Sequence, residues 1–309
     1  MGATGATGAT GPQGPEGCAQ MQAALLQWYP TKYNVGANPI GIAFDGTNIW
    51  VTSGNTSKVT KLVACTGAYV GAYTVGSVPF GIAFDGTNIW VTNDGSTTVT
   101  KLLASTGALV GTFTVGSGPE GVAFDGTYIW VVNSVSNTVT KLLASTGAAV
   151  GTFNVGHAPF GVAFDGTNIW VTNGVDNTVT KLLAMTGVTV GTYNVGQVPE
   201  GVAFDGTNIW VANDESNTVT KLVASTGALV GTYNVGSGPI AVAFDGTNIW
   251  VTNSGHGTGN TVTKLLASTG ANLGTFPVGT SPEGVTFDGT NIWVTGSASN
   301  NVTKISAAQ

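Results

Sequence analysis

Charge is scarce in this chain of 309 residues. The sequence contains no arginine, nine lysines and 15 acidic residues, so that only 8% of its residues are charged. Without arginine, bidentate contacts to phosphates or guanine edges cannot form, and a net charge of −6 offers no basic surface to a polyanion. We therefore expect no nucleic-acid partner.

Long apolar runs and metal-binding patterns are also missing. No stretch of about 18 apolar residues occurs, so we expect no membrane insertion. Two cysteines, two histidines and no Asp-x-Asp-x-Asp-Gly loop predict no metal site and no cofactor. No basic segment followed by an apolar one marks a signal peptide near Met1.

What the sequence does contain is a repeat. The string FDGTNIWV, or a variant with one residue changed, occurs seven times, with a step of 40 residues five times and then 43. The extra residues follow Asn253, in the stretch SGHGTGN. Self-similarity at this period is the signature of a solenoid, a propeller or a repeat array.

Each repeat contains four short apolar segments separated by turn residues. In the third repeat the expected strands are 121–125, 129–133, 139–144 and 148–155, with Asp-Gly-Thr and Ser-Thr-Gly between the paired segments. Glycine, proline and β-branched residues interrupt every candidate helix. Four antiparallel strands every 40 residues predict a β-propeller blade, and hence an all-β fold with seven blades.

The order of the segments predicts how the ring closes. A lone fourth-strand segment lies at about residues 29–35, and the last repeat stops after a third strand at about 301–306. The early segment should therefore complete the last blade, which leaves no open edge. The predicted organisation is a tail at 1–19, a connector at 20–27 and the propeller at 28–309.

Three residue types recur in every repeat. The Asp of FDG should shape its turn, because Asp can accept hydrogen bonds from the backbone two residues on. The Trp should lie in the core between blades, and the Lys of VTKL is expected to be a solvated residue that discourages edge pairing. The Asp residues are Asp45, Asp85, Asp125, Asp165, Asp205, Asp245 and Asp288; the Trp residues are Trp50, Trp90, Trp130, Trp170, Trp210, Trp250 and Trp293; the Lys residues are Lys61, Lys101, Lys141, Lys181, Lys221, Lys264 and Lys304.

The strings WVTN and WVAN, with Pro-x-Gly upstream and Thr-Gly downstream, resemble the YVTN-type seven-bladed propellers over about residues 28–306. That group is related to the NHL propellers and to virginiamycin B lyase. The resemblance implies the propeller fold. In the lyases, catalytic histidines follow the blade proline and act with a glutamate and a magnesium ion, whereas this chain has Ile, Phe or Glu after that proline and Asn, Ser or Gly in place of the glutamate. The resemblance therefore does not carry over the lyase site.

The tail has a different composition. Residues 2–19 form six Gly-x-y triplets, the pattern of a collagen triple helix. The tail is either part of a trimeric stalk, which would make the protein a homotrimer, or a disordered segment. For Cys18 and Cys65 an intrachain disulfide, bridges between Cys18 residues of a trimer, and free thiols all stay open. The tail resembles bacterial and phage collagen-like fibres, which implies an extracellular, cell-surface or virion location.

Differences between the repeats predict where a ligand would bind. The FDGT and STG turns are nearly constant, whereas the linker before each proline and the loop after each WVTN vary on the opposite face. Varied loops on a constant scaffold are typical of recognition surfaces. The residue after each proline should circle the mouth of the central channel: Ile40, Phe80, Glu120, Phe160, Glu200, Ile240 and Glu283. These carboxylates could bind a cation, an amine or sugar hydroxyls, and the rings could stack on a sugar; solvated carboxylates and rim packing are the simpler alternative.

Further candidates lie in the varied loops. Asp214, Glu215 and His256 are expected near the mouth, with Asp94 and Asp176 in equivalent loops and His157 and Gln197 in linkers. No Gly-x-Ser-x-Gly elbow and no nucleophile paired with a base is present. We therefore predict a non-enzymatic module that binds a glycan or protein ligand through the varied face. A structural spacer and, less favoured, a lyase-like enzyme are the alternatives.

Overall fold

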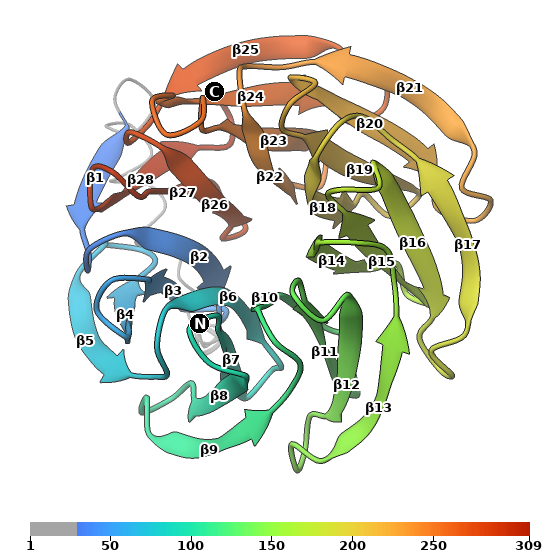
Figure 1. The fold of residues 1–309 in the computed structure, drawn as a ribbon. Coiled ribbons are helices and arrows are strands. Elements are labelled where there is room, and N and C mark those ends of the chain that lie inside the picture. The colour runs from blue at the N-terminus through green and yellow to red at the C-terminus, as the bar shows by residue number, and fades with distance from the viewer. Residues whose placement is uncertain (1–29) are drawn as a thin grey trace, which may run out of the picture.

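In the computed structural model, which describes residues 30–309, every regular element is a β-strand (Figure 1). Seven four-stranded antiparallel sheets stand around a central axis. The predicted all-β, seven-bladed propeller is confirmed. The predicted tail and connector, with Cys18, lie outside the described residues. Among the described residues there is no helix that could cross a membrane.

The two inner strands of each blade carry the Pro-x-Gly and WVTN motifs. A proline begins every innermost strand, where its missing N–H costs no ladder hydrogen bond. The innermost strands are β2 (Pro39–Phe44), β6 (Pro79–Phe84), β10 (Pro119–Phe124), β14 (Pro159–Phe164), β18 (Pro199–Phe204), β22 (Pro239–Phe244) and β26 (Pro282–Phe287). The second strands are β3 (Asn48–Ser53), β7 (Asn88–Asn93), β11 (Tyr128–Asn133), β15 (Asn168–Asn173), β19 (Asn208–Asn213), β23 (Asn248–Asn253) and β27 (Asn291–Gly296).

The two outer strands differ in burial. The third strand is almost wholly buried, whereas the fourth alternates between exposed and half-buried residues at the rim. The third strands are β4 (Lys58–Val63), β8 (Thr98–Leu103), β12 (Thr138–Leu143), β16 (Thr178–Leu183), β20 (Thr218–Val223), β24 (Thr261–Leu266) and β28 (Asn301–Ser306). The fourth strands are β5 (Tyr69–Thr74), β9 (Leu109–Thr114), β13 (Ala149–Asn154), β17 (Thr189–Asn194), β21 (Leu229–Asn234), β25 (Asn272–Pro277) and β1 (Thr31–Asn34).

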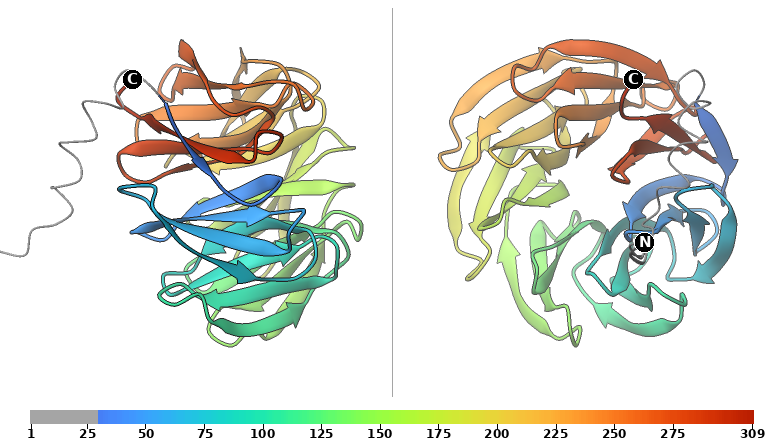
Figure 2. Two further views of the ribbon diagram at one scale, coloured as in Figure 1. Left: turned by 90° about the vertical axis from the view of Figure 1, so that its left-hand side faces the viewer. Right: turned by 180° about the vertical axis from the view of Figure 1, so that it is seen from behind.

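The ring closes as predicted. The last sheet has the order β1-β28-β27-β26, so the first strand of the chain completes the last blade (Figures 1 and 2). Four residue pairs join β1 to β28, from Thr31 opposite Lys304 to Asn34 opposite Asn301. The closing strand is shorter than the expected 29–35, and β28 has the expected bounds.

The hydrophobic core lies between blades rather than within them. Each of the seven repeated tryptophans is 0% exposed and packs against residues of the following blade. Trp50 and Val59, for example, share a cluster with Ile89, Val91 and Leu102. The predicted placement of the tryptophans is confirmed. A single blade leaves the apolar surface that faces its neighbours uncovered, so its stability depends on both of them.

The repeated aspartate shapes its turn and also holds the tryptophan. In the third blade Asp125 Oδ1 accepts the backbone N–H groups of Thr127 and Tyr128 at 2.9 and 2.6 Å, and Oδ2 accepts the indole N–H of Trp130 at 2.8 Å. The equivalent bonds occur in all seven blades. Burial acts to raise the pKa of the Asp85 carboxyl. Hydrogen bonds from Trp90, Asn88 and Thr87 lower the pKa by more than burial raises it, so the pKa lies below its ordinary value.

The prediction for the repeated lysine was wrong. Lys141 is 2% exposed, and its Nζ donates to the backbone carbonyls of Ala184 and Met185 in the next blade, at 2.6 and 3.1 Å. The same ammonium lies 5.0 Å from the ring centroid of Trp130. The third strand is covered by the fourth, so a long side chain there can run between blades and reach the orphaned carbonyls of the neighbouring turn. The lysine links blades instead of protecting an edge.

All seven lysines make the equivalent link. Five of them reach the turn that follows the third strand of the next blade, and Lys264 reaches the chain end after β28. Lys304 of the last blade reaches Ala64 and Cys65 of the first blade, at 2.8 and 3.0 Å. Each ammonium also lies about 5 Å from its own tryptophan ring. The lysine of the last blade thus helps to close the ring.

We expect Lys141→Met to lower the free energy of unfolding by about 2–3 kcal/mol, because it leaves two buried carbonyls without a donor. Lys58→Met, at an exposed lysine, should change it by less than about 0.5 kcal/mol. Denaturant titration of both variants measures the difference. Equal losses would show that the inter-blade bonds do not stabilise the ring.

Candidate functional site

The varied face consists of the linker before each proline and the loop between the second and third strand of the same blade. Hydrogen bonds tie the two together: Asp214 N–H donates to Val198 C=O at 2.9 Å, and Val198 N–H donates to Asn177 Oδ1 of the preceding blade at 2.9 Å. The residue before the proline has a positive φ in every blade, including Val78 and Val198, both at 49°. A β-branched residue is strained there, so the surrounding bonds hold the linker in place.

The backbone of the mouth is fixed by contacts from each blade to the innermost strand of the next. Thr172 Oγ1 donates to Glu200 C=O of the next blade at 2.6 Å, and equivalent threonine bonds occur in four other blades. Only glycine fits at position 161, since a Cβ there would lie 2.3 Å from the same carbonyl oxygen. These bonds use the backbone of the mouth residue and leave its side chain free to vary.

The mouth residues predicted from the sequence are all half-buried at the start of the innermost strands. The two aromatic side chains meet: the rings of Phe80 and Phe160 lie 5.5 Å apart, edge to face, although β10 lies between their strands. This contact covers one side of the mouth with apolar surface. Ile40 and Ile240 add further apolar residues to the ring.

The three mouth glutamates are poorly solvated. Oε2 of Glu120 and Oε2 of Glu200 are buried, and neither has a hydrogen-bond partner among the described residues. Burial, with the negative charge of Asp94 added, raises the pKa of Glu120 to about 7 although the Ser134 hydroxyl opposes the change. Burial, then the charges of Asp214, Glu283 and Glu120, raise the pKa of Glu200 to about 8.

Glu283 differs because it has partners. Its Oε1 accepts the hydroxyl groups of Ser281 and Ser297 at 3.2 and 3.3 Å. Burial still raises the pKa of Glu283 above its ordinary value, with the hydroxyl groups working against it. The mouth therefore concentrates carboxylates, and within residues 30–309 none of these three glutamates forms an ion pair.

A hollow of about 430 Å³ opens beside Glu200, between the fourth and fifth blades. Phe160, Val175, Val198 and Pro199 form its apolar wall, and the polar groups are Asn177, Gln197, Glu200 and Glu215. Val175 is 70% exposed at its edge. The hollow combines an aromatic ring, two amides and two carboxylates on one surface. We name it the blade 4/5 hollow.

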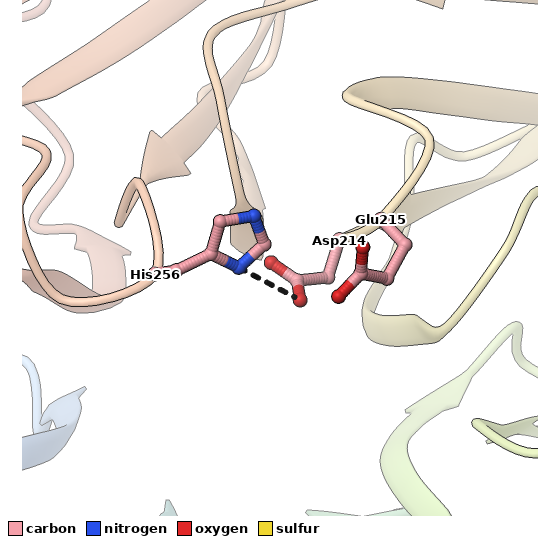
Figure 3. Close-up of side chains that lie close together, drawn as sticks. All are labelled: Asp214, Glu215 and His256. Carbon is pink, nitrogen blue, oxygen red and sulfur yellow. Dashed lines mark ion pairs between the residues drawn. The ribbon is translucent and has the colours of Figure 1, made fainter.

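The structure also brings together three predicted residues from two loops: Asp214 and Glu215 of the fifth blade and His256 of the sixth (Figure 3). One donor atom from each lies within 4.8 Å of the others. Burial raises the pKa of Asp214 above its ordinary value, and the positive charge of His256 opposes this rise without cancelling it. The three-residue insertion after Asn253 lengthens the loop that carries His256.

Other predicted residues lie apart from this group. His157 Nδ1 lies 2.9 Å from Asp176 Oδ1, and hydrogen bonds from the His157 backbone and ring lower the pKa of Asp176. Asp94 lies near Glu120, as its effect on that carboxyl shows. Gln197 lines the blade 4/5 hollow. The Cys18–Cys65 pairing involves a residue outside the described part of the chain.

Some residues of the hollow were not predicted. Val175, Asn177 and Val198 did not stand out because single valines and asparagines are common in loops. Their only signal was variation between repeats, since the position of Val175 is Asn, Gly, Val, Glu or Ala in the other repeats. They can be identified only from the structure, which places the loop of one blade beside the linker of the next.

These features define a seven-bladed propeller with an acidic mouth and one varied face. No protein-family model matches the sequence, and a search of the curated proteins finds no relative. Among solved structures, virginiamycin B lyase of Staphylococcus aureus is similar, with a TM-score of 0.76, 17% identity, and coverage of 90% of this chain and 99% of the lyase. A catalytically inactive variant of that lyase with quinupristin gives a TM-score of 0.77.

Hydrazine synthase of Kuenenia stuttgartiensis is similar to the same degree, with a TM-score of 0.76, 19% identity, and coverage of 89% of this chain and 98% of the other. At such identities the likeness shows the fold alone. Two enzymes with unlike names share it, which agrees with the rule that function resides in the site rather than in the fold.

We expect Glu200→Gln to stabilise the protein only at high pH. The pKa of Glu200 is about 8 in the folded state and about 4.5 in the unfolded state, so between these pH values the folded protein binds more protons. The free energy of unfolding of the wild type therefore falls as the pH rises through this range. The melting temperatures of variant and wild type should be close at pH 5, and the variant should melt several degrees higher at pH 9.

Differential scanning calorimetry at the two pH values tests this expectation. Glu215→Gln, at an exposed carboxylate of the same hollow, is the matched control and should show no gap that grows with pH. A constant offset of Glu200→Gln at both pH values would attribute the effect to packing instead of charge.

Proposed function

We propose that this protein is a non-enzymatic binding module that holds an amino-sugar glycan in the blade 4/5 hollow. The observation that carries the proposal is the buried, unpartnered carboxylate oxygen of Glu200 at the edge of an open hollow. With a pKa of about 8, Glu200 keeps its proton at neutral pH in the free protein; a protonated amine that displaces this proton supplies both a positive charge and a hydrogen-bond donor. No side chain of residues 30–309 provides them within ion-pair distance.

The wall of the hollow suits a sugar ring. Sugars present apolar C–H faces to aromatic rings, and Phe160 provides such a surface. The amides of Asn177 and Gln197 can donate and accept hydrogen bonds with sugar hydroxyl groups. A volume of about 430 Å³ lies in the range of small-molecule sites.

The tail adds display to the proposal. A collagen-like stalk at residues 2–19 would present three propellers together, and linked sites raise avidity without new contacts. This arrangement fits the proposed extracellular, cell-surface or virion location. A protein ligand on the same face and a structural spacer are the outcomes against which the glycan is tested.

One observation favours a second candidate function, an acid–base enzyme. Carboxyl groups with pKa values of about 7 and 8, as at Glu120 and Glu200, can exchange protons near neutral pH. An enzyme would convert the bound glycan, whereas a binding module would release it unchanged. Mass spectrometry of the ligand after incubation separates the two.

We expect chitosan tetramer, which carries free amines, to bind more tightly than the N-acetylated chitin tetramer. In isothermal titration calorimetry at pH 7, Glu200→Gln should weaken chitosan binding by about tenfold or more, which is about 1.4 kcal/mol. Asp94→Asn, at a carboxylate of the same face outside the hollow, is the matched control and should leave binding unchanged.

Each other result has a defined meaning. Equal binding of the two tetramers would reject the amine, and a loss in Asp94→Asn equal to that in Glu200→Gln would reject the hollow. Binding of a lysine-rich peptide but of neither tetramer would replace the glycan with a protein ligand. No binding of any of these probes would leave the structural spacer.

A further inference from the structure

The loop cluster of Asp214, Glu215 and His256 has a geometry that hydrogen bonding does not account for. His256 Nδ1 lies 3.5 Å from Asp214 Oδ2, longer than the 2.7–3.2 Å of an ordinary N–H···O bond. Figure 3 shows the imidazole facing the two carboxylates across this gap. A separation of this size corresponds to two ligands of one tetrahedral metal ion, since donors about 2.0–2.2 Å from the centre lie about 3.4 Å apart.

One oxygen of the Asp214 carboxylate lacks a hydrogen-bond partner. The side chain is 13% exposed, and Oδ1 is buried without a hydrogen bond among the described residues. The backbone N–H of Asp214 is bonded to Val198 C=O, which holds in place the backbone from which the side chain projects. A buried carboxylate without a donor or cation is costly, and a metal ion would remove that cost.

The other two donors come from exposed positions at the opening. Glu215 is exposed next to Asp214, and His256 is 51% exposed on the lengthened loop of the sixth blade. The donor atoms of all three residues lie within 4.8 Å of one another. Three protein ligands at an open edge leave a coordination position for water or another ligand, as in mixed histidine–carboxylate sites.

The donor set decides the class of ion. We propose that Asp214, Glu215 and His256 bind one divalent first-row transition metal, with Zn²⁺ as the representative ion. Imidazole nitrogen is a good ligand for this class, whereas Ca²⁺ and Mg²⁺ take oxygen ligands, of which this cluster has too few for Ca²⁺. The site joins two neighbouring blades, because Asp214 and Glu215 follow β19 and His256 follows β23.

The other histidine of the varied face provides a matched control. His157 Nδ1 also faces a carboxylate, at 2.9 Å from Asp176 Oδ1, which is a direct hydrogen bond. The structure places no second carboxylate with this pair in a group of three donors, in the part of the chain it describes. His157 and His256 therefore share face, residue type and an acidic neighbour, and differ in the geometry that the proposal invokes.

The experiment is isothermal titration calorimetry of ZnCl₂ into the full-length, tag-free protein after chelator treatment, with no glycan present. One saturable site is expected in wild type and in His157→Ala. His256→Ala and Asp214→Asn should each weaken it by at least about tenfold, the lower end of what even outer-shell partners of a metal cost. Co²⁺ should give an absorption spectrum of a nitrogen- and oxygen-ligated ion that is lost in His256→Ala.

Other outcomes overturn the proposal. No saturable site in wild type, or an affinity that His256→Ala leaves unchanged, would reject this ligand set. Equal losses in His157→Ala and His256→Ala would reject the specific geometry. A circular dichroism melt of each metal-free variant shows whether it is folded; a folded His256→Ala variant that keeps the wild-type affinity decides against the site. Since the probe is the metal alone, failure of the glycan proposal does not affect this result.

Discussion

The tryptophan buried between blades is the feature on which the rest of the structure depends. Its indole N–H is bonded to the turn aspartate of its own blade, and its ring lies under the ammonium of its own lysine, which in turn bonds carbonyls of the next blade. One side chain thus connects a turn, a core and an inter-blade link. Seven copies of this unit position every loop of the varied face relative to the others.

Much of the fold could be predicted from the sequence because repetition reports topology directly. The period defined the blades, the FDGT and STG turns defined the hairpins, and the order of the segments defined the closing strand. The lysines were misassigned because a VTKL segment looks the same whether its charge faces solvent or a neighbouring carbonyl. Only the distance between adjacent blades decides that question, and no pattern within one repeat contains it.

The candidate site was predictable to a lesser degree for a related reason. The mouth positions followed from one residue per repeat, and the loop residues Asp214, Glu215 and His256 were singled out one by one. Their meeting across two blades depends on the length of an inserted loop and on a left-handed backbone residue, His256, at its tip. Burial of the Glu120 and Glu200 oxygens is likewise a property of the assembled mouth, where Phe80 and Phe160 also meet although they belong to different blades.

The short closing strand has a mechanical consequence. A pull applied at Thr31 enters the ring at β1, which is held to β28 by four residue pairs, whereas every other outer strand continues from its own blade. Resistance to such a load is set by this one seam and by the stacking of Tyr33 on Trp293 beneath it, and not by the summed stability of seven blades. Under tension the ring would open at one predetermined place while the other six blades stay assembled.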